Sequence, residues 1–238
     1  MKELLRDKGF WAAASVAFLG LAAGFPFYEI EIPLNQGSFQ KFYQTALESQ
    51  TMLFLVPIAA VLSPGASYLR ESLSGFLKFY ISRTSRIDYT IRKTLSIYAG
   101  GFLPFFLAGS LGLSLSFFFL YPLELKGAVP WEEVQKTLGT LLRISFTGGI
   151  LAELSGIFAA IFQNYYMAYG LPFVVYYMMV ILKERYLPKL YALYPGEWVL
   201  CKENWGAGGM GIWAFFLIFS IAFLLVHSLL LYWRIQEI

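Results

Sequence analysis

Apolar residues in this chain come in long blocks rather than at alternating positions or on one face of a helix. A helix that spans a membrane needs about 20 mostly apolar residues, and several blocks reach that length. The strands of a membrane barrel would instead alternate between apolar and polar residues. We therefore predict an all-α membrane protein with a single transmembrane domain over residues 1–238, whose six spans lie at about residues 10–28, 52–69, 95–121, 141–163, 165–186 and 210–233.

The longest apolar stretch, residues 144–182, is too long for a single crossing at about 1.5 Å per residue. Glu153 is its only residue that is charged at neutral pH. The stretch must therefore form a hairpin, and "QNYYMAYGLP" at 163–172 supplies the turn. We expect Gly170 to cap the first helix of this hairpin and Pro172 to stand in the first turn of the second.

The composition supports a membrane protein and excludes several other classes. Hydrophobic residues make up 58% of the 238 residues and charged residues only 14%, whereas soluble domains carry about a quarter charged residues. The formal net charge of +3 is too small to indicate nucleic-acid binding. Cys201 is the only cysteine, so neither a disulfide within the chain nor a site with several cysteine ligands can form.

The distribution of charge predicts the orientation of the spans. Residues 70–93, which we call the elbow, hold six cations against two acids, a net charge of +4, whereas residues 29–50 carry −2 and residues 122–143 carry zero. Cytoplasmic loops collect Lys and Arg, so the elbow and both termini are expected in the cytoplasm, in a bacterial plasma membrane. The connector at 183–205 then lies outside, in the interface or dipping back into the bilayer; a fifth span that fails to cross would move it inside.

The sequence offers little that could support catalysis. It contains no Gly-Lys dipeptide and therefore no phosphate-binding P-loop, and it has no G-x-S-x-G motif. The paired glutamates of "WEEVQK" at 131–136 resemble those of membrane proteases, but His227 is the only histidine and a metal site of that kind needs more. We predict that the chain is not an enzyme, and that it holds no metal and no cofactor.

Three polar residues in the apolar blocks have two interpretations each. A carboxylate near the middle of a span normally faces the bundle interior, a partner or a watery cavity, so Glu153 either contacts substrate or forms a hydrogen bond between helices. Nearby glycines at 148, 149 and 156 also favour close helix packing. His227 either lies in a translocation path or is a neutral imidazole bonded to a neighbouring helix, and we favour the second. Asn164, in the hairpin turn, is a further candidate for the path.

The elbow has a definite order of residue types. An acid, a glycine, a short apolar and aromatic helix, a basic break and two residues entering the next span follow one another: Glu71, Gly75, "FLKFYIS", "RTSR", Tyr89 and Lys93. An ordinary basic loop that touches lipid headgroups would not need this order. A short amphipathic helix followed by a basic turn suits the groove of a soluble partner and could transmit force to both flanking spans.

This pattern resembles the permease subunits of type-2 ATP-binding-cassette (ABC) exporters. In that family the second span ends in Glu, Gly follows four residues later, and a coupling helix leads to an "SR…Y…K" entry into the third span, here Glu71, Gly75, Ser82, Arg83, Tyr89 and Lys93. The match of motifs covers residues 63–93, and the match of layout covers nearly the whole chain. The first external loop is short, so the resemblance gives no support for a large external recognition domain.

The resemblance implies partners and roles. Two permeases, either copies or paralogues, would lie side by side in the lipid, each docking one ATPase subunit that carries ATP and Mg²⁺. The coupling helix would span about residues 72–83, "MKELLRDK" at the N-terminus would form an interfacial helix, and Glu71 would pair with a basic residue. The residues expected to couple to the ATPase are Glu71, Gly75, Lys78, Tyr80, Arg83, Arg86, Tyr89 and Lys93.

The predicted function is export of a hydrophobic or amphiphilic substrate, such as a small peptide or an antibiotic, driven by a separate ATPase. Spans rich in aromatic residues and poor in charge suit such a substrate better than a sugar or an ion. The alternative is a membrane anchor or assembly subunit without a translocation path of its own. A membrane-embedded enzyme ranks last, because so few residues can act as acid or base.

Overall fold

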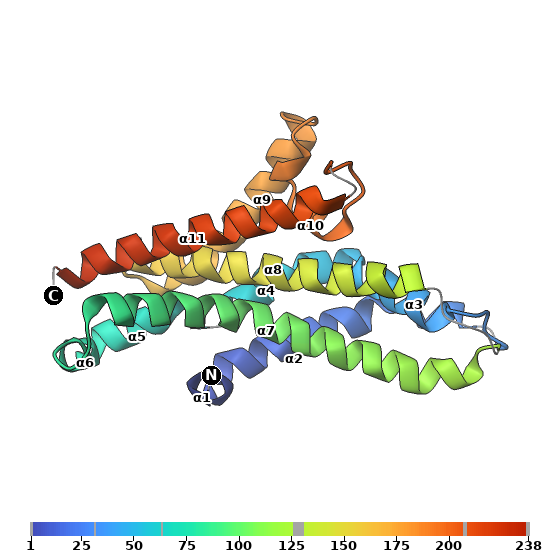
Figure 1. The fold of residues 1–238 in the computed structure, drawn as a ribbon, viewed down its shortest axis with the longest axis horizontal. Coiled ribbons are helices and arrows are strands. Elements are labelled where there is room, and N and C mark those ends of the chain that lie inside the picture. Colours follow the sequence, from blue (N-terminus) through green and yellow to red (C-terminus); the bar gives the residue numbers. More distant parts are fainter. Residues whose placement is uncertain (1, 31, 63, 126–130, 207–208, 237–238) are drawn as a thin grey trace.

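The computed structural model describes residues 2–30, 32–62, 64–125, 131–206 and 209–236. These residues form helices and no strand, apart from a single bridge between Leu34 and Glu124. Most of the long helices run side by side along one long axis, with α6 at one end and α3 at the other, while α9 rises obliquely from the bundle (Figure 1). They are α1 (Lys2–Arg6), α2 (Lys8–Gly24), α3 (Ser38–Leu47), α4 (Gln50–Leu62), α5 (Ser67–Leu73), α6 (Phe76–Ile81), α7 (Arg86–Leu120), α8 (Trp131–Phe162), α9 (Tyr165–Arg185), α10 (Pro195–Leu200) and α11 (Met210–Gln236).

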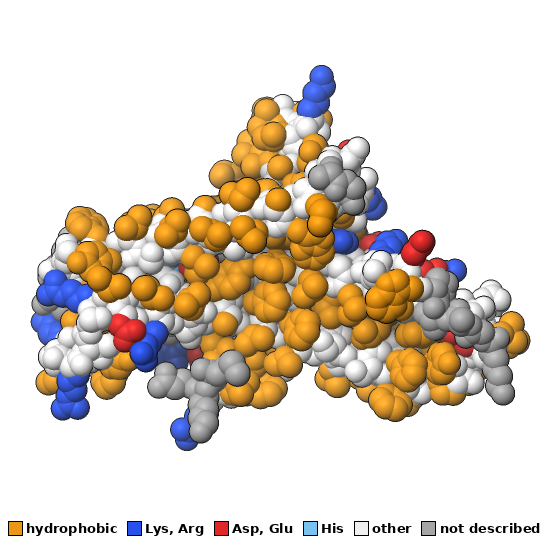
Figure 2. Space-filling model, viewed as in Figure 1, with side chains coloured by type: hydrophobic (Ala, Val, Ile, Leu, Met, Phe, Trp, Pro, Cys, Tyr) orange, Lys and Arg blue, Asp and Glu red, His pale blue; other side chains and the backbone are white. Residues whose placement is uncertain are grey.

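Six helical segments in the described residues are long and apolar enough to cross a membrane, which confirms the predicted number of spans. They are Lys8–Glu29, Gln50–Leu73, Arg86–Leu123, Trp131–Phe162, Tyr165–Arg185 and Met210–Gln236. On the face seen in Figure 2, hydrophobic side chains extend along the bundle, and Lys and Arg lie at the end that carries α6 and also towards the other ends of the helices. This arrangement fits a multi-pass membrane protein.

The helices that contain the third and fourth predicted spans begin before those spans. The third span is predicted from about residue 95 and its helix begins at Arg86, and the fourth is predicted from about residue 141 and its helix begins at Trp131. Polar residues in these segments continue the helix instead of ending it, so α7, with 35 residues, is about 50 Å long. The predicted polar connector at 122–143 is therefore partly helix, and its residues 126–130 lie outside the described part.

Helix α8 lies at the centre of the bundle, and 78% of its most apolar stretch of 18 residues is buried. It packs closely against α7 where two glycines face each other: a Cβ on Gly101 would lie 2.5 Å from the carbonyl oxygen of Gly148. A Cβ on Gly149 would meet the ring of Tyr98 at 3.0 Å. These contacts confirm that the glycines of α8 form a packing face.

The turn between the fourth and fifth spans differs from the prediction. Helix α8 ends at Phe162, and α9 begins at Tyr165 after Asn164, whose side chain accepts a hydrogen bond from the backbone N–H of Tyr166. Gly170 and Pro172, expected in the turn, lie inside α9. The prediction was wrong because an Asn N-cap begins the helix six residues before the glycine, and a Pro inside a helix that spans a membrane is tolerated.

The connector after α9 folds back towards the bundle. Residues 195–199 of α10 are buried, and the Arg143 Nε of α8 donates a hydrogen bond of 2.9 Å to the carbonyl oxygen of Val199. At the same end of the bundle, α3 packs on α7, where the Tyr43 hydroxyl donates to the carbonyl oxygen of Gly109 at 2.7 Å. Two segments predicted as polar connectors thus contain short helices that contribute to the core.

Candidate functional site

The elbow forms a sharp return between two spans at one end of the bundle. Helix α5 ends at Leu73, and Gly75 adopts a left-handed conformation (φ 73°) that turns the chain into α6. Glycine takes this conformation at little cost, which explains its place in the pattern. After α6, Ser85 begins α7 as an N-cap, because its hydroxyl accepts a hydrogen bond from the backbone N–H of Asp88 at 3.1 Å.

Glu71 connects the two sides of this return. Its carboxylate accepts one hydrogen bond from the Tyr89 hydroxyl at 2.6 Å and another from the Lys93 ammonium at 2.5 Å. The Lys93 side chain is only 11% exposed and that of Glu71 33%. Partial burial reduces solvent screening, so this pair is stronger than an open surface pair. The expectation that Glu71 pairs with a basic residue is confirmed, and its partner is Lys93.

Helix α6 is held from beneath and presents apolar residues outward. Leu77 is buried, and the Tyr80 ring lies 5.5 Å from the Tyr89 ring, centroid to centroid. On the outer side, Phe76 is 57% exposed and Phe79 75% exposed. Three cations predicted to couple to a partner, Lys78, Arg83 and Arg86, are exposed as well. Exposed aromatic residues with cations beside them are typical of a protein interaction surface.

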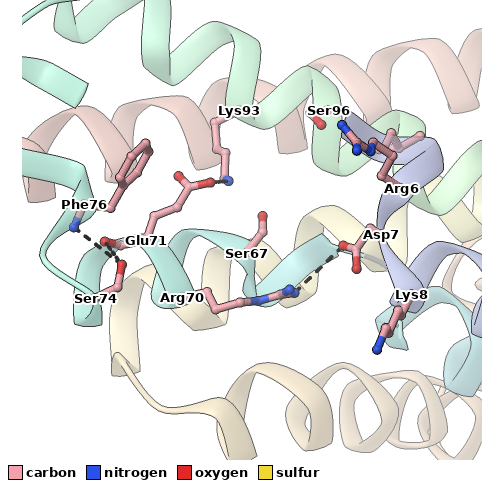
Figure 3. A pocket seen from close by; sticks show the side chains of 11 residues that line it. Arg6, Asp7, Lys8, Ser67, Arg70, Glu71, Ser74, Phe76, Lys93 and Ser96 are labelled. Atoms are coloured by element: carbon pink, nitrogen blue, oxygen red, sulfur yellow. Dashed lines mark hydrogen bonds and ion pairs between the residues drawn. The ribbon is translucent and has the colours of Figure 1, made fainter. Parts of the chain in front are cut away.

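A charged cleft lies beside the elbow (Figure 3). It has a volume of about 740 Å³ and is lined by residues of α1, α5 and α7, together with the turn between α1 and α2 and the start of α6. Arg70 of α5 reaches across towards Asp7, with the two side chains 3.8 Å apart, and Lys93 reaches in from α7 towards Glu71. The cleft thus joins the elbow to the N-terminal helix.

Glu153 and His227 lie far along the chain from the elbow and contact each other. The Nδ1 of His227 on α11 lies 2.5 Å from a carboxylate oxygen of Glu153 on α8, and both side chains are fully buried. Gly156 makes room for the imidazole, because a Cβ there would lie 2.3 Å from His227 Cε1. This is the contact between neighbouring helices that we favoured for His227.

The structure does not bring Asn164 to this pair. Asn164 is exposed at the turn between α8 and α9, where it caps α9. In the described part of the chain, no group of three or more metal-ligating side chains occurs. The contact between Glu153 and His227 joins two neighbouring helices, α8 and α11.

Two residues that contribute to these sites were not among the sequence candidates. Asp7 caps α2, accepting from the backbone N–H of Gly9 at 3.0 Å, and also faces Arg70. Arg143 is buried in α8, where it bonds Val199 and donates from Nη2 to the Thr140 hydroxyl at 2.7 Å. An acid directly before an apolar helix is a known start signal and could have identified Asp7.

Comparisons of the chain with models of known protein families, with curated proteins and with solved structures found no match.

Proposed function

We propose that this chain is the membrane-spanning permease subunit of an ABC exporter, driven by a separate ATPase subunit that docks on α6. The observation that carries this proposal is the construction of the elbow. Helix α6, which has an exposed aromatic and basic surface, packs on α7 through Tyr80 and Tyr89, and α5 directly before it is fastened by Glu71 to the start of the following span. A force applied to such a helix reaches the bundle with little loss in local bending.

The proposed mechanism assigns ATP chemistry to the partner and movement to this chain. Closure of two ATPase subunits on ATP and Mg²⁺ would draw together the α6 helices of two permeases, which are either copies or paralogues. Because Lys93 and Tyr89 fasten α5 to α7, the second and third spans would move as one unit. The permease pair would then change from opening towards the ATPases to opening on the opposite side.

A hydrophobic or amphiphilic substrate, such as a small peptide or an antibiotic, suits the apolar spans. An apolar cavity of about 470 Å³ between α2, α3 and α7 supports this class, since its walls include Phe18, Phe25, Leu115 and Phe119. Its one tyrosine, Tyr43, directs its hydroxyl to a backbone carbonyl. Ligand pockets are commonly about 300–1,000 Å³ and largely apolar. Helix α3, which contributes to its lining, lies at the end of the bundle opposite α6 (Figure 1).

The first test distinguishes loss of ATPase docking from failure of the chain to insert into the membrane. Arg83→Glu with Arg86→Glu reverses two exposed charges of the basic break, and we expect loss of ATPase co-purification and of coupled transport with normal membrane insertion. Arg185→Glu with Lys189→Glu is the matched control, because it reverses two exposed cations away from the elbow, one at the C-terminal end of α9 and one just after it. Equal binding and transport in the first variant and the control would refute docking at the elbow.

A second experiment addresses the alternative that the chain is an anchor or assembly subunit. Replacing the catalytic glutamate of the ATPase blocks hydrolysis but leaves the complex intact. An exporter then accumulates its substrate inside cells, whereas an anchor without a translocation path does not change substrate levels. If the substrate level in cells does not change, the result favours the anchor or assembly subunit.

A further inference from the structure

The cleft beside the elbow continues into a second cavity along α7. The first cavity has a volume of about 740 Å³ and the second about 850 Å³. Five residues line both: Leu4, Glu71, Phe76, Lys93 and Ser96. The two cavities therefore adjoin along these residues, with α1 on one side and the elbow on the other.

The first cavity carries an excess of positive charge. Its charged lining comprises four cations and two acids: Arg6, Lys8, Arg70 and Lys93 against Asp7 and Glu71. Both acids are already engaged, Asp7 with the backbone of α2 and with Arg70, and Glu71 with Tyr89 and Lys93. Within the described part of the chain, no ion pair joins Arg6 or Lys8 to an acid.

Neutral hydrogen-bond donors accompany these charges. Ser67 of α5 and Ser96 of α7 line the first cavity from opposite walls. Figure 3 shows the Arg6 guanidinium close to Ser96, and Arg70 extending along the other wall. Guanidinium groups and hydroxyls together are the donors that recognise phosphate oxygens in proteins. The charge and the donors therefore select an anion with several oxygens.

The second cavity adds an apolar side, which a free anion would not need. Leu95 and Ala99 of α7 extend its lining beyond the charged part, and Leu95 is 52% exposed. Trp11 is also exposed, and its indole N–H donates to the carbonyl oxygen of Leu5 at 2.8 Å. Trp is enriched where a membrane meets water, so this end of the cleft lies at the depth of lipid headgroups.

We propose that the cleft binds one anionic phospholipid, with its phosphate between Arg6 and Arg70 and its acyl chains along the exposed apolar side of α7. Clusters of cations between spans on the cytoplasmic side attract anionic headgroups, and the charge distribution predicts that this end is cytoplasmic. This site requires only that the chain is embedded in a membrane, so it is independent of the proposed ATPase partner.

The cleft is preformed, which favours specific binding over a diffuse attraction. A Cβ on Gly9 would lie 2.3 Å from the carbonyl oxygen of Leu62, so the start of α2 is pressed against the end of α4. Asp7 fixes the junction of α1 and α2, and Glu71 fixes the opposite wall. A rigid site loses less entropy when its ligand binds.

The test uses the full-length permease alone, purified in a neutral detergent and titrated with phosphatidylglycerol while binding is followed by native mass spectrometry. Arg6→Gln with Arg70→Gln removes one cation from each wall. Each cation near an anionic headgroup contributes roughly fivefold in affinity, so we expect phosphatidylglycerol to bind at least about tenfold more weakly. Lys41→Gln with Lys189→Gln, which removes two exposed cations elsewhere, should bind as the wild type does.

Two further ligands distinguish the source of the phosphate. Phosphatidylcholine, which has no net charge, should bind more weakly than phosphatidylglycerol. Inorganic phosphate should not displace phosphatidylglycerol at matched concentration; if it does, the site is an anion site and the lipid proposal is wrong. Should the double variant fail to fold, Ser96→Trp fills the cleft without changing its charge and should weaken phosphatidylglycerol binding to the same extent.

The remaining outcome concerns the ATPase. If Arg6→Gln with Arg70→Gln leaves phosphatidylglycerol binding unchanged but weakens co-purification of the ATPase, the cleft belongs to the protein interface, and the lipid proposal is overturned. Loss of lipid binding with normal ATPase docking supports the lipid site. Because lipid binding is measured without the ATPase, failure of either proposal is visible separately.

Discussion

The bond network of Glu71 should contribute measurably to stability, and a double-mutant cycle can isolate it. Glu71→Gln keeps the shape of the side chain but removes the charge that faces Lys93, and Lys93→Met removes the cation while keeping its apolar stem. Charge-assisted hydrogen bonds contribute about 1.5–3 kcal/mol. Because the Glu71 side chain is 33% exposed, screening lowers this value, so we expect a coupling free energy of about 1–2 kcal/mol.

A second pair in the same elbow is the matched control. Asp88 and Arg92 form an ion pair of 3.0 Å one turn apart on α7, but their side chains are 43% and 71% exposed. Such pairs contribute only about 0.3–0.5 kcal/mol. Both cycles are measured by reversible denaturant unfolding in detergent, followed by tryptophan fluorescence. Coupling energies that agree within about 0.3 kcal/mol would refute the reasoning that burial strengthens the Glu71 pair.

Three other predictions concern single positions. Gly156→Ala should lower the free energy of unfolding by about 1–3 kcal/mol, because the added Cβ would overlap the His227 ring. Gly170→Ala is the control: a Cβ at Gly170 has no atom within 4 Å, so the free energy of unfolding should change by less than about 1 kcal/mol. Desolvation raises the pKa of the Cys201 thiol, so its alkylation rate should still increase above pH 9.0, the ordinary value, and a plateau below that pH would contradict this. Glu153→Gln can still form a hydrogen bond with His227, so its thermal unfolding temperature should be close to that of the wild type, whereas Glu153→Leu should lower the free energy of unfolding by about 1–3 kcal/mol. Normal transport by Glu153→Gln at every pH would exclude a role for protonation of the Glu153 carboxylate.

The sequence predicts the spans well because their signal is local. Each apolar block is long enough to require a bilayer, and the six candidate segments contain most of the predicted ranges. The helices differ from the predicted spans where a helix continues beyond its apolar part. The segments that begin at Arg86 and at Trp131 contain many polar residues, but polar residues form helices readily when they lie outside the membrane. A hydropathy pattern predicts which residues lie in the membrane, but it does not predict where the helix begins or ends.

The hydrogen bonds and ion pairs of the candidate site could be identified only once the fold was known. The family resemblance predicts that Glu71 has a basic partner, but several cations of the elbow satisfy this expectation equally. The choice of Lys93 depends on the direction in which α7 leaves the elbow. The same holds for Glu153 and His227, which are 74 residues apart, and for Asp7 and Arg70, because only the packing of the helices brings them together.

Two neighbouring residues of α5 connect the elbow to two different helices, and the connections are unequal. Glu71 bonds Lys93 at 2.5 Å in a largely buried place, whereas Arg70 lies 3.8 Å from Asp7 with its side chain 61% exposed. A displacement of α5 should therefore move α7 before it moves the N-terminal helices. Helix α7 in turn packs closely against α8 at Gly101 and Gly148, where a Cβ on Gly101 would lie 2.5 Å from the carbonyl oxygen of Gly148. Movement of the elbow should consequently reach the buried centre of the bundle first, and a lipid bound between Arg6 and Arg70 would strengthen the weaker connection to α2.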